Sequence, residues 1–115
     1  MANEYYLLSD DPKTGKSMMS LEAIGNIAKT SLRNVKDAYT FKKDSETCKV
    51  RMSKGGDIDI DIVIKIMQGS DIAKVCEDLQ REVYDHLLDM AGIRPRSVNI
   101  DVAGFISDKD EIEGA

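Results

Sequence analysis

Three aspartates stand at every second position in the stretch GGDIDIDIVIKI, and carboxylates at such spacing could bind a cation. Asp57, Asp59 and Asp61 match the opening of a calcium-binding loop, D-x-[DN]-x-[DN]-G. The match fails at Ile62, where that loop needs glycine, and at Gln68, where it needs glutamate. In an extended strand, alternate residues lie about 6.6–6.8 Å apart, so the carboxylates form a row and cannot converge on one ion. The pattern therefore predicts the water-facing side of a strand.

A second candidate is the run Gly15-Lys16-Ser17, which ends in the manner of a phosphate-binding loop, G-x-x-x-x-G-K-[ST]. Asp10 occupies the place of the first glycine and Asp11 follows it, so two negative charges would face a nucleotide. A β-hairpin pattern also comes later, where a nucleotide-binding fold needs a parallel crossover. A nucleotide-binding enzyme that uses residues 15–17 is therefore the least favoured alternative.

His86 is the single histidine of the chain and falls between Glu82 and Asp89 on a helical pattern. A carboxylate one turn away could make it a base or a weak metal ligand, but no serine or cysteine stands at a recognisable nucleophile turn for it to activate. We expect a structural role for His86.

The sulfur-containing side chains suggest packing and not chemistry. Cys48 and Cys76 are too few and too far apart for a disulfide scaffold, a zinc site or a redox motif, so both are expected to be reduced and partly buried. No histidine or cysteine is spaced to complete a soft-metal site with the methionines. The methionines expected to pack are Met18, Met19, Met52, Met67 and Met90. The sequence thus predicts no catalytic residue, cofactor or metal.

The first half of the chain changes from a strand pattern to a helix pattern. Residues 4–8, EYYLL, favour a strand, and residues 10–15 are turn-like. From Ser20, placed to cap a helix, apolar residues recur at spacings of three and four, which predicts a helix to about residue 38. Its stripe consists of Leu21, Ile24, Ala28, Leu32, Val35 and Tyr39.

Strict alternation in the middle of the chain predicts a β-hairpin. Apolar residues alternate from Cys48 to Met52 and again, after SKGG, from Ile58 to Ile66. If both strands turn their apolar residues to one face, Lys49 and Arg51 lie opposite two of the three aspartates. Such pairs would stabilise the hairpin by roughly 0.2–1 kcal/mol each.

A second helical stripe and a last strand follow. Ser70 is the expected N-cap and Gly92 the expected stop of this helix, and residues 97–105 alternate as a strand. The stripe consists of Ile72, Val75, Cys76, Leu79, Val83, Leu87 and Met90. The element order β-α-β-β-α-β predicts an α+β two-layer sandwich, with two amphipathic helices on one face of a small mixed sheet. We expect one domain at residues 1–106 and a flexible acidic tail at 107–115.

Composition narrows the classes of function. With 42% hydrophobic and 32% charged residues, the chain is typical of a soluble protein, and no apolar run is long enough to insert into a membrane. The N-terminus lacks the pattern of a secretory signal, which predicts a cytoplasmic protein. The net charge of -5 arises after residue 46, and this disfavours nucleic acid as a partner.

Residues 15–28, GKSMMSLEAIGNIA, resemble the opening motif of the alkaline shock protein family, the envelope stress response proteins of Gram-positive bacteria. In that motif a glycine and a short strand lead to a serine-capped helix. The later stretches DIDIDIVIKI, GSDIAKVCEDLQREV and MAGIRPRSVNIDVAGF are similar to the family's run of strand, glycine, helix and strand. The matching positions are Gln80 with Val83, Met90 with Gly92, and Val98 and Asn99 with Val102.

The resemblance covers residues 15–106, with two departures. Where the family often has Gly-Val after its first helix, this chain has residues 35–38, VKDA, so we expect a different exit from that helix. The long polar tail of some members is reduced here to a few residues. The family pattern carries no catalytic residues to transfer.

The resemblance implies a non-enzymatic cytoplasmic protein of cell-envelope homeostasis that works through self-association and through partners, which can be membrane-anchored. Because one relative is linked with control of fatty-acid synthesis, a regulatory binding protein of a fatty-acid or lipid biosynthetic enzyme complex is the alternative. We expect the interaction face on the charged side of the hairpin, formed by Lys49, Arg51, Asp57, Asp59, Asp61 and Lys65.

Overall fold

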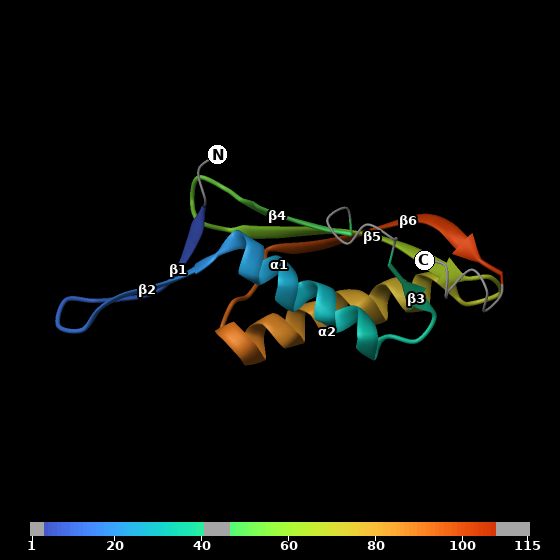
Figure 1. The fold of residues 1–115 in the computed structure, drawn as a ribbon, viewed down its shortest axis with the longest axis horizontal. Coiled ribbons are helices and arrows are strands. Elements are labelled where there is room, and N and C mark those ends of the chain that lie inside the picture. The colour runs from blue at the N-terminus through green and yellow to red at the C-terminus, as the bar shows by residue number, and fades with distance from the viewer. Residues whose placement is uncertain (1–3, 41–46, 108–115) are drawn as a thin grey trace.

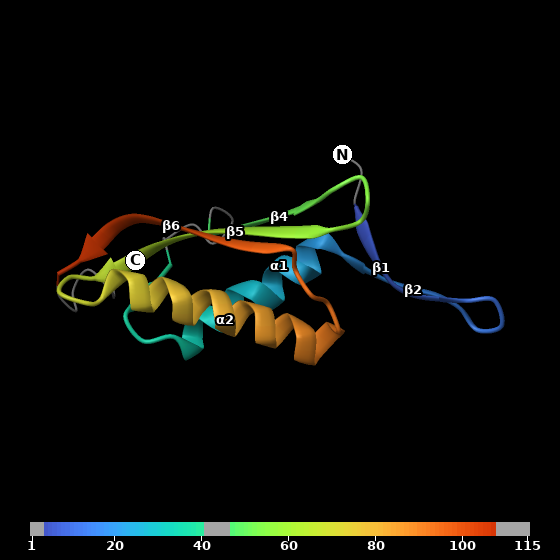
Figure 2. The ribbon, with the colours of Figure 1, turned by 180° about the vertical axis from the view of Figure 1, so that it is seen from behind.

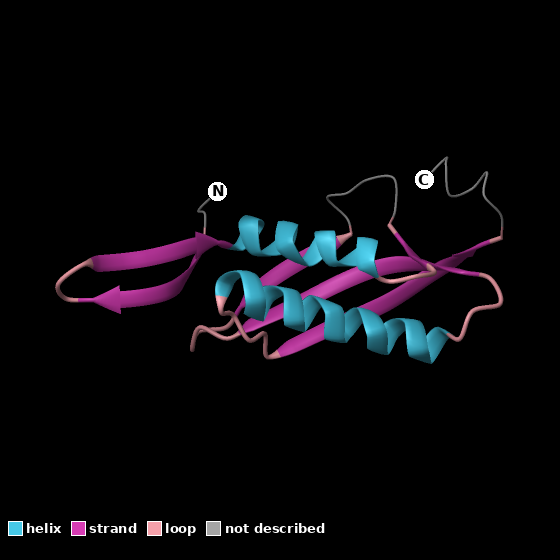
Figure 3. Cartoon of the chain, turned by 90° about the horizontal axis from the view of Figure 1, so that it is seen from below, coloured by secondary structure: helices cyan, strands magenta, loops and turns pink. Residues whose placement is uncertain are grey.

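The computed structural model describes residues 4–40 and 47–107. Two helices lie on one face of a four-stranded sheet, and a two-stranded arm extends from one end of this body (Figures 1 and 3). The longest dimension, 55 Å, includes the arm. The predicted α+β class and two-layer arrangement are confirmed. Residues 108–115, nearly all of the expected flexible tail, lie outside the described residues.

The predicted hairpin forms the centre of the sheet. Strands β4 (Cys48–Met52) and β5 (Ile58–Met67) pair antiparallel, with Val50 opposite Ile60. Because side chains alternate between the faces of a strand, every isoleucine of β5 enters the core, and each is at most 1% exposed. These residues are Ile58, Ile60, Ile62, Ile64 and Ile66.

Two further strands complete a mixed sheet. Strand β6 (Ser97–Ile106) runs parallel to β5 along one edge (Figure 2), as a strand connected through a long helix can. Strand β3 (Ala38–Tyr39), which was not predicted, pairs with residues 65–66 of β5, whereas β4 pairs with residues 58–62. Since β6 occupies one edge of β5, β3 and β4 share the other.

Helix α1 (Leu21–Thr30) begins as predicted, because the Ser20 hydroxyl accepts a hydrogen bond of 3.1 Å from the backbone N–H of Ala23. The predicted end near residue 38 is wrong. The helix ends at Thr30 and is followed by a short 3-10 helix, η1 (Ser31–Asn34).

The early end has a local cause. The hydroxyls of Thr30 and Ser31 both donate to the carbonyl of Ile27, at 2.7 and 3.4 Å, and such side-chain bonds compete with the helical ladder. Val35 is then extended and Asp37 has a φ of 72°, so the chain turns into β3. The predicted stripe nevertheless reaches the core, because the turn carries it over the sheet; its later buried members are Leu32 and Val35.

Helix α2 (Ile72–Ala91) is capped by Asp71, whose carboxylate accepts a hydrogen bond of 3.2 Å from the N–H of Lys74. The prediction of Ser70 as the cap is therefore wrong by one residue. Gly92 ends the helix as predicted, in the left-handed conformation with φ 68°. The buried stripe of the helix consists of Val75, Leu79, Val83 and Leu87.

The predicted N-terminal strand, β1 (Tyr5–Asp11), does not join the main sheet. It pairs antiparallel with β2 (Gly15–Ser20) to form the arm. The residue pattern missed β2, although the family motif contains a short strand there. Lys16 lies opposite Asp10, so residues 15–17 belong to an extended strand and do not wrap at the start of a helix as a phosphate-binding loop does.

Candidate functional site

The face of the sheet that is turned away from the helices carries the charged side chains. Asp59 and Asp61 alternate with the core isoleucines of β5 and therefore point to this outer face. On β4, Lys49 lies opposite Asp61 and Arg51 opposite Asp59, which confirms the predicted register.

Arg51 makes its strongest contact diagonally. Its Nε lies 2.6 Å from Asp61 Oδ2 and its second terminal nitrogen 3.1 Å from Asp61 Oδ1, whereas the other terminal nitrogen is 4.0 Å from Asp59. Long side chains reach such diagonal neighbours across paired strands. The Arg51 side chain remains 58% exposed, so this ion pair still faces water.

Arg96 contacts Asp59 from the side opposite Arg51, and the sequence analysis did not predict this contact. Its Nε and a terminal nitrogen donate to the two carboxylate oxygens of Asp59, at 3.1 and 2.5 Å, and its other terminal nitrogen lies 3.4 Å from Asp57. The backbone N–H of Arg96 donates to the carbonyl of Ile58 at 2.7 Å, which fixes the residue beside the start of β5. The Asp59 side chain is consequently only 7% exposed.

Two polar residues of β6 complete the arrangement. The Ser97 hydroxyl donates to Asp59 at 2.6 Å, and the amide nitrogen of Asn99 donates to Asp61 at 2.9 Å. Both lie directly opposite their aspartates because β6 is parallel to β5. The two contacts could have been predicted from the length of the connection between β5 and β6. A twenty-residue helix between two strands permits them to pair in parallel, which would place Ser97 and Asn99 beside the aspartates. We call the connected set the outer-face network: Arg51, Asp57, Asp59, Asp61, Arg96, Ser97 and Asn99.

The network keeps its carboxylates ionised. Hydrogen bonds from Arg96 and then Ser97 lower the pKa of Asp59 to about 2, and the bond from Arg51 lowers the pKa of Asp61. The same contacts raise the pKa values of both arginines. All four groups are therefore charged at neutral pH, which suits fixed recognition of a partner and not proton transfer.

The structure brings together four of the six residues expected to form the interaction face, namely Arg51, Asp57, Asp59 and Asp61. Lys49 is exposed on the same face, opposite Asp61. Lys65 lies opposite Gly104, four residues beyond Asp61 along β5 and hence roughly 13 Å away along the strand. Whether these residues bind a partner stays a prediction.

His86 joins the two helical segments. Its Nδ1 lies 3.1 Å from the hydroxyl of the buried Ser31, and its Nε2 lies 2.9 Å from the sulfur of Met90. The ring therefore links α2 to η1, which supports the structural role expected from the sequence.

The sulfur-containing side chains divide between core and surface. Cys48 and Cys76 are free and half-buried, as expected, and burial raises the pKa of Cys48 to about 11. Met19 and Met52 pack against the core. Met18 and Met90, in contrast, are 56% and 63% exposed, so the expectation of packing is wrong for these two.

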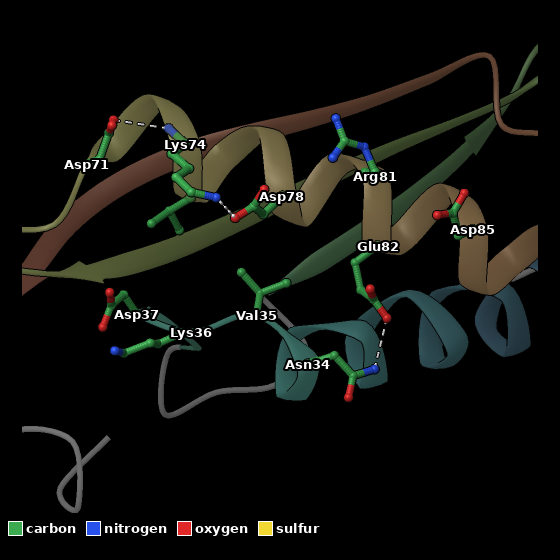
Figure 4. Close-up of a pocket in the computed structure, with 11 residues that line it drawn as sticks. Asn34, Val35, Lys36, Asp37, Asp71, Lys74, Asp78, Arg81, Glu82 and Asp85 are labelled. Carbon is green, nitrogen blue, oxygen red and sulfur yellow. Dashed lines mark hydrogen bonds and ion pairs between the residues drawn. The ribbon is translucent and has the colours of Figure 1, made fainter.

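A separate hollow of about 570 Å³ lies between α2 and the segment that leads from η1 to β3 (Figure 4). Its lining is largely charged, and some of the charges are paired: Lys74 lies 2.9 Å from Asp78, and the Asn34 amide donates to Glu82 at 3.0 Å. The second bond joins η1 to α2 across the hollow. We therefore interpret the hollow as a polar contact region between η1 and α2, and we assign no ligand to it.

Within residues 4–40 and 47–107, no group of three or more histidine, cysteine, aspartate or glutamate side chains is arranged to hold a metal ion. The three aspartates at 57, 59 and 61 are instead hydrogen-bonded to neighbouring strands and to Arg96. No helix in the same part of the chain combines the length and the apolar character needed to cross a membrane.

Comparison with known proteins gives a family and one relative. The model of the alkaline shock protein 23 family, described as having a cell envelope-related function, matches residues 13–107. An uncharacterized protein of Streptococcus pyogenes serotype M6 is 28% identical over 97 residues, which cover 77% of this chain and 75% of the relative. No solved structure matches the chain. The family match includes every element from β2 to β6 and thus the whole outer-face network.

Proposed function

Because the chain belongs to the alkaline shock protein 23 family, whose function is related to the cell envelope, we propose that it is a non-enzymatic cytoplasmic protein of the envelope stress response. In this proposal it acts by self-association and by binding other proteins, including a membrane-anchored one. The family supports the link to the envelope, and the geometry of the outer face supports binding as the mode of action.

The observation that carries the binding proposal is the outer-face network. The side chains of Arg51 and Arg96 are 58% and 54% exposed, yet aspartate carboxylates hold each guanidinium in place. A charged group that is already ordered loses little conformational freedom when a partner arrives, which favours binding. The network is also part of the sheet face that is turned away from both described helices (Figure 1).

The charges of this face indicate what it would recognise. Positive and negative groups alternate over a short distance, so a partner of matching mixed charge would be selected and oriented by electrostatic complementarity. A uniformly negative partner such as a phosphate backbone would meet Asp57, Asp59 and Asp61 together with the arginines. The face therefore suits a protein partner and not a nucleic acid.

Capture of partners at native expression level tests the proposal. The tagged wild-type protein would be compared with the double variant Arg51→Ala/Arg96→Ala, and with Lys74→Ala as a control that removes a positive charge from α2 on the opposite layer. We expect membrane proteins in the wild-type and control captures and their loss from the double variant. Circular dichroism would establish that each variant is folded.

Three outcomes would overturn the proposal. Recovery of fatty-acid or lipid biosynthetic subunits in place of membrane proteins would favour the regulatory alternative. A strictly monomeric protein that captures neither class would contradict a scaffold function. ATP binding abolished by Lys16→Ala would support the nucleotide-binding alternative, whereas the strand conformation of residues 15–17 leads us to expect no ATP binding by the wild type.

A further inference from the structure

Strand β4 has a free edge. It pairs with β5 on one side, and none of the described strands pairs with its other side. Just before β4, the carbonyl of Thr47 accepts a hydrogen bond of 2.8 Å from the N–H of Val63 on β5. Backbone groups of alternate residues point to opposite sides of a strand, so the odd-numbered residues of β4 face β5 and the even-numbered residues face the free edge. The even-numbered residues are Cys48, Val50 and Met52.

Strand β6 has the opposite free edge of the described sheet. Since the odd-numbered residues of β5 bond to β4, its even-numbered residues bond to β6. In a parallel pair, a residue bonds to the two neighbours of the residue that lies opposite it, so the residue opposite turns its own backbone groups outward. The outward residues of β6 are therefore Val98, Ile100 and Val102. In agreement, the carbonyl of Val98 accepts a hydrogen bond of 2.9 Å from the side chain of Gln80 on α2.

The apolar side chains of both edge strands are incompletely covered. They pack against the core on the helix side of the sheet but are only partly buried, whereas the isoleucines of β5 between them are at most 1% exposed. A strand added at either edge would bury more of this apolar surface, which favours association. A free strand edge is also a template on which another chain can pair. The partly buried side chains are those of Cys48, Val50, Met52, Val98, Ile100 and Val102.

The residues of β6 repeat the pattern by which β5 pairs with β4. Residues 58–62 of β5 read IDIDI, and residues 98–102 of β6 read VNIDV. Within the hairpin, Lys49 lies opposite Asp61. If β6 of a second copy lay antiparallel along the free edge of β4, Asp101 would lie opposite Lys49 in the same way, and each outward residue of β4 would meet an outward residue of β6. The free edge of β4 therefore fits a second copy of a strand like the one with which it already pairs.

The charges select this register. Lys49 and Asp101 are both exposed on the outer face of the sheet, and neither makes an ion pair with another described residue. Opposite charges that lie directly across antiparallel strands attract each other. A shift by two residues in either direction would separate Lys49 from Asp101 and would leave one apolar residue of β4 without an apolar residue opposite it. The pairing is thus specified by charge as well as by the alternation of apolar residues.

The directions of the strands determine how the copies would be arranged. Relative to β5, β4 is antiparallel and β6 is parallel. A β6 strand that is antiparallel to β4 therefore belongs to a copy in the same orientation, with its helices on the same face of a continuous sheet (Figure 3). One free β4 edge and one free β6 edge would remain at the two ends. Such a contact between unlike surfaces repeats, and the twist of the sheet turns the result into an open helical chain.

We propose that copies of this chain assemble side by side through antiparallel pairing of β4 of one copy with β6 of the next, with Lys49 opposite Asp101. This inference rests on the self-association included in the proposed function and assigns it to two strand edges. The outer-face networks of successive copies then lie on one continuous surface. Repetition of the same binding face strengthens attachment to a partner that is itself present in many copies, such as a membrane-anchored protein.

Opposite charge changes in the full-length protein test this contact. Lys49→Asp would face Asp101 of the next copy, and Asp101→Lys would face Lys49, so each variant alone should self-associate roughly tenfold or more weakly than the wild type. An equimolar mixture of the two variants should assemble again, because each supplies the charge that the changed edge of the other needs. Lys36→Asp, at an exposed position outside both edges, is the control and should assemble like the wild type. Light scattering across a dilution series measures the mass, and circular dichroism establishes that each variant is folded.

Cross-linking tests the register. Lys49→Cys and Asp101→Cys, in separate proteins that are mixed and then oxidised, should give a covalent dimer, because side chains directly opposite each other in an antiparallel pair are close enough for a disulfide. Lys36→Cys mixed with Asp101→Cys should give none. Wild-type protein, which retains both native cysteines, controls for their own reaction.

The outcomes separate this pairing from the proposed function. Self-association that neither charge variant weakens, or that the mixture does not restore, would overturn the strand pairing and leave the proposed function standing. A wild-type mass that stops at a dimer would show a closed contact and would also overturn the pairing. A monomeric wild type that still captures membrane proteins would overturn the pairing and leave the membrane-anchored partner of the proposed function standing.

Discussion

Arg96 donates two parallel hydrogen bonds to Asp59, at 3.1 and 2.5 Å, across 37 residues of sequence. Bidentate arginine–carboxylate pairs are among the stronger polar contacts because both partners are charged and the geometry is fixed. Here the pair joins the loop after α2 to the first residues of β5. It therefore fixes the start of β6 beside the central strand, on the face where we propose that partners bind.

The first prediction concerns the dependence of stability on pH. The pKa of Asp59 is about 2 in the folded protein against 3.8 as the ordinary value, so its ionised form stabilises the fold. This contribution is complete above pH 3.8 and is lost as the pH falls toward 2. We expect Asp59→Asn to lower the melting temperature by a few degrees at pH 7, and this difference from the wild type to close as the pH falls below about 4.

Titration of the carboxyl groups by NMR checks the cause. The wild type should show an Asp59 midpoint near 2, and Arg96→Ala should raise it, since the Arg96 hydrogen bond is the largest cause of the shift. A wild-type midpoint at or above 3.8 would show that the pair does not form in solution.

The second prediction concerns the start of α2. Asp71→Ala removes the side chain that accepts the N–H of Lys74 and should lower the free energy of unfolding by about 1 kcal/mol. Ser70→Ala is the matched control, because Ser70 precedes the cap. This substitution should lower the free energy of unfolding by only a few tenths of that amount. Urea denaturation of the two variants measures both values. Equal losses, or a larger loss from Ser70→Ala, would contradict the assignment of the cap.

The sequence was sufficient to predict β5, because its alternation distinguishes a buried from a wet face over ten residues. The sequence was insufficient to predict short elements whose conformation depends on contacts with residues far away in the chain. Strand β3 has two residues, which take an extended form only because β5 lies beside them. The apolar stripe of α1 continued past Thr30 because the 3-10 turn keeps the same side toward the core, so periodicity could not reveal where the hydrogen bonding changed.

The sequence predicted the part of the candidate site that lies on β4 and β5, but not the part that lies beside β6. The alternation of β4 and β5 was enough to place Lys49 and Arg51 opposite the aspartates, since a hairpin fixes its own register. Arg96, Ser97 and Asn99 come from the other edge of β5, and their positions depend on which strand becomes its neighbour there. The packing of α2 on the sheet determines that β6 becomes this neighbour. The sequence of residues 96–99 carries no periodic pattern that reveals it.

The third prediction concerns two glycines with opposite requirements. Gly92 adopts φ 68°, where an L-residue clashes with its own carbonyl, so Gly92→Ala should lower the free energy of unfolding by about 1 kcal/mol. Gly25 lies inside α1, and a Cβ there meets Val50 at an ordinary contact distance of 3.4 Å. Gly25→Ala should therefore be neutral or stabilising by up to about 1 kcal/mol, because alanine favours the helix. Thermal unfolding of both variants checks this difference in sign, and two equal losses would contradict it.

The last prediction concerns the reactivity of Cys48. Burial raises the pKa of this thiol to about 11 from 9.0, so at pH 8 the folded protein should contain about a hundredfold less thiolate than an unfolded chain. Since the thiolate is the reactive form, alkylation of Cys48 should be slower by at least this factor in native protein than in urea. A Cys76→Ser background would isolate the signal.

The charge of Lys29 opposes the effect of burial on Cys48, because it favours the thiolate. Lys29→Ala should therefore raise the pKa further and slow alkylation again. Glu22→Ala, which removes a charge of opposite sign from the exposed surface of the same helix, serves as the control and should not slow it. An unchanged rate in Lys29→Ala would show that the ammonium group does not face Cys48 in the folded protein.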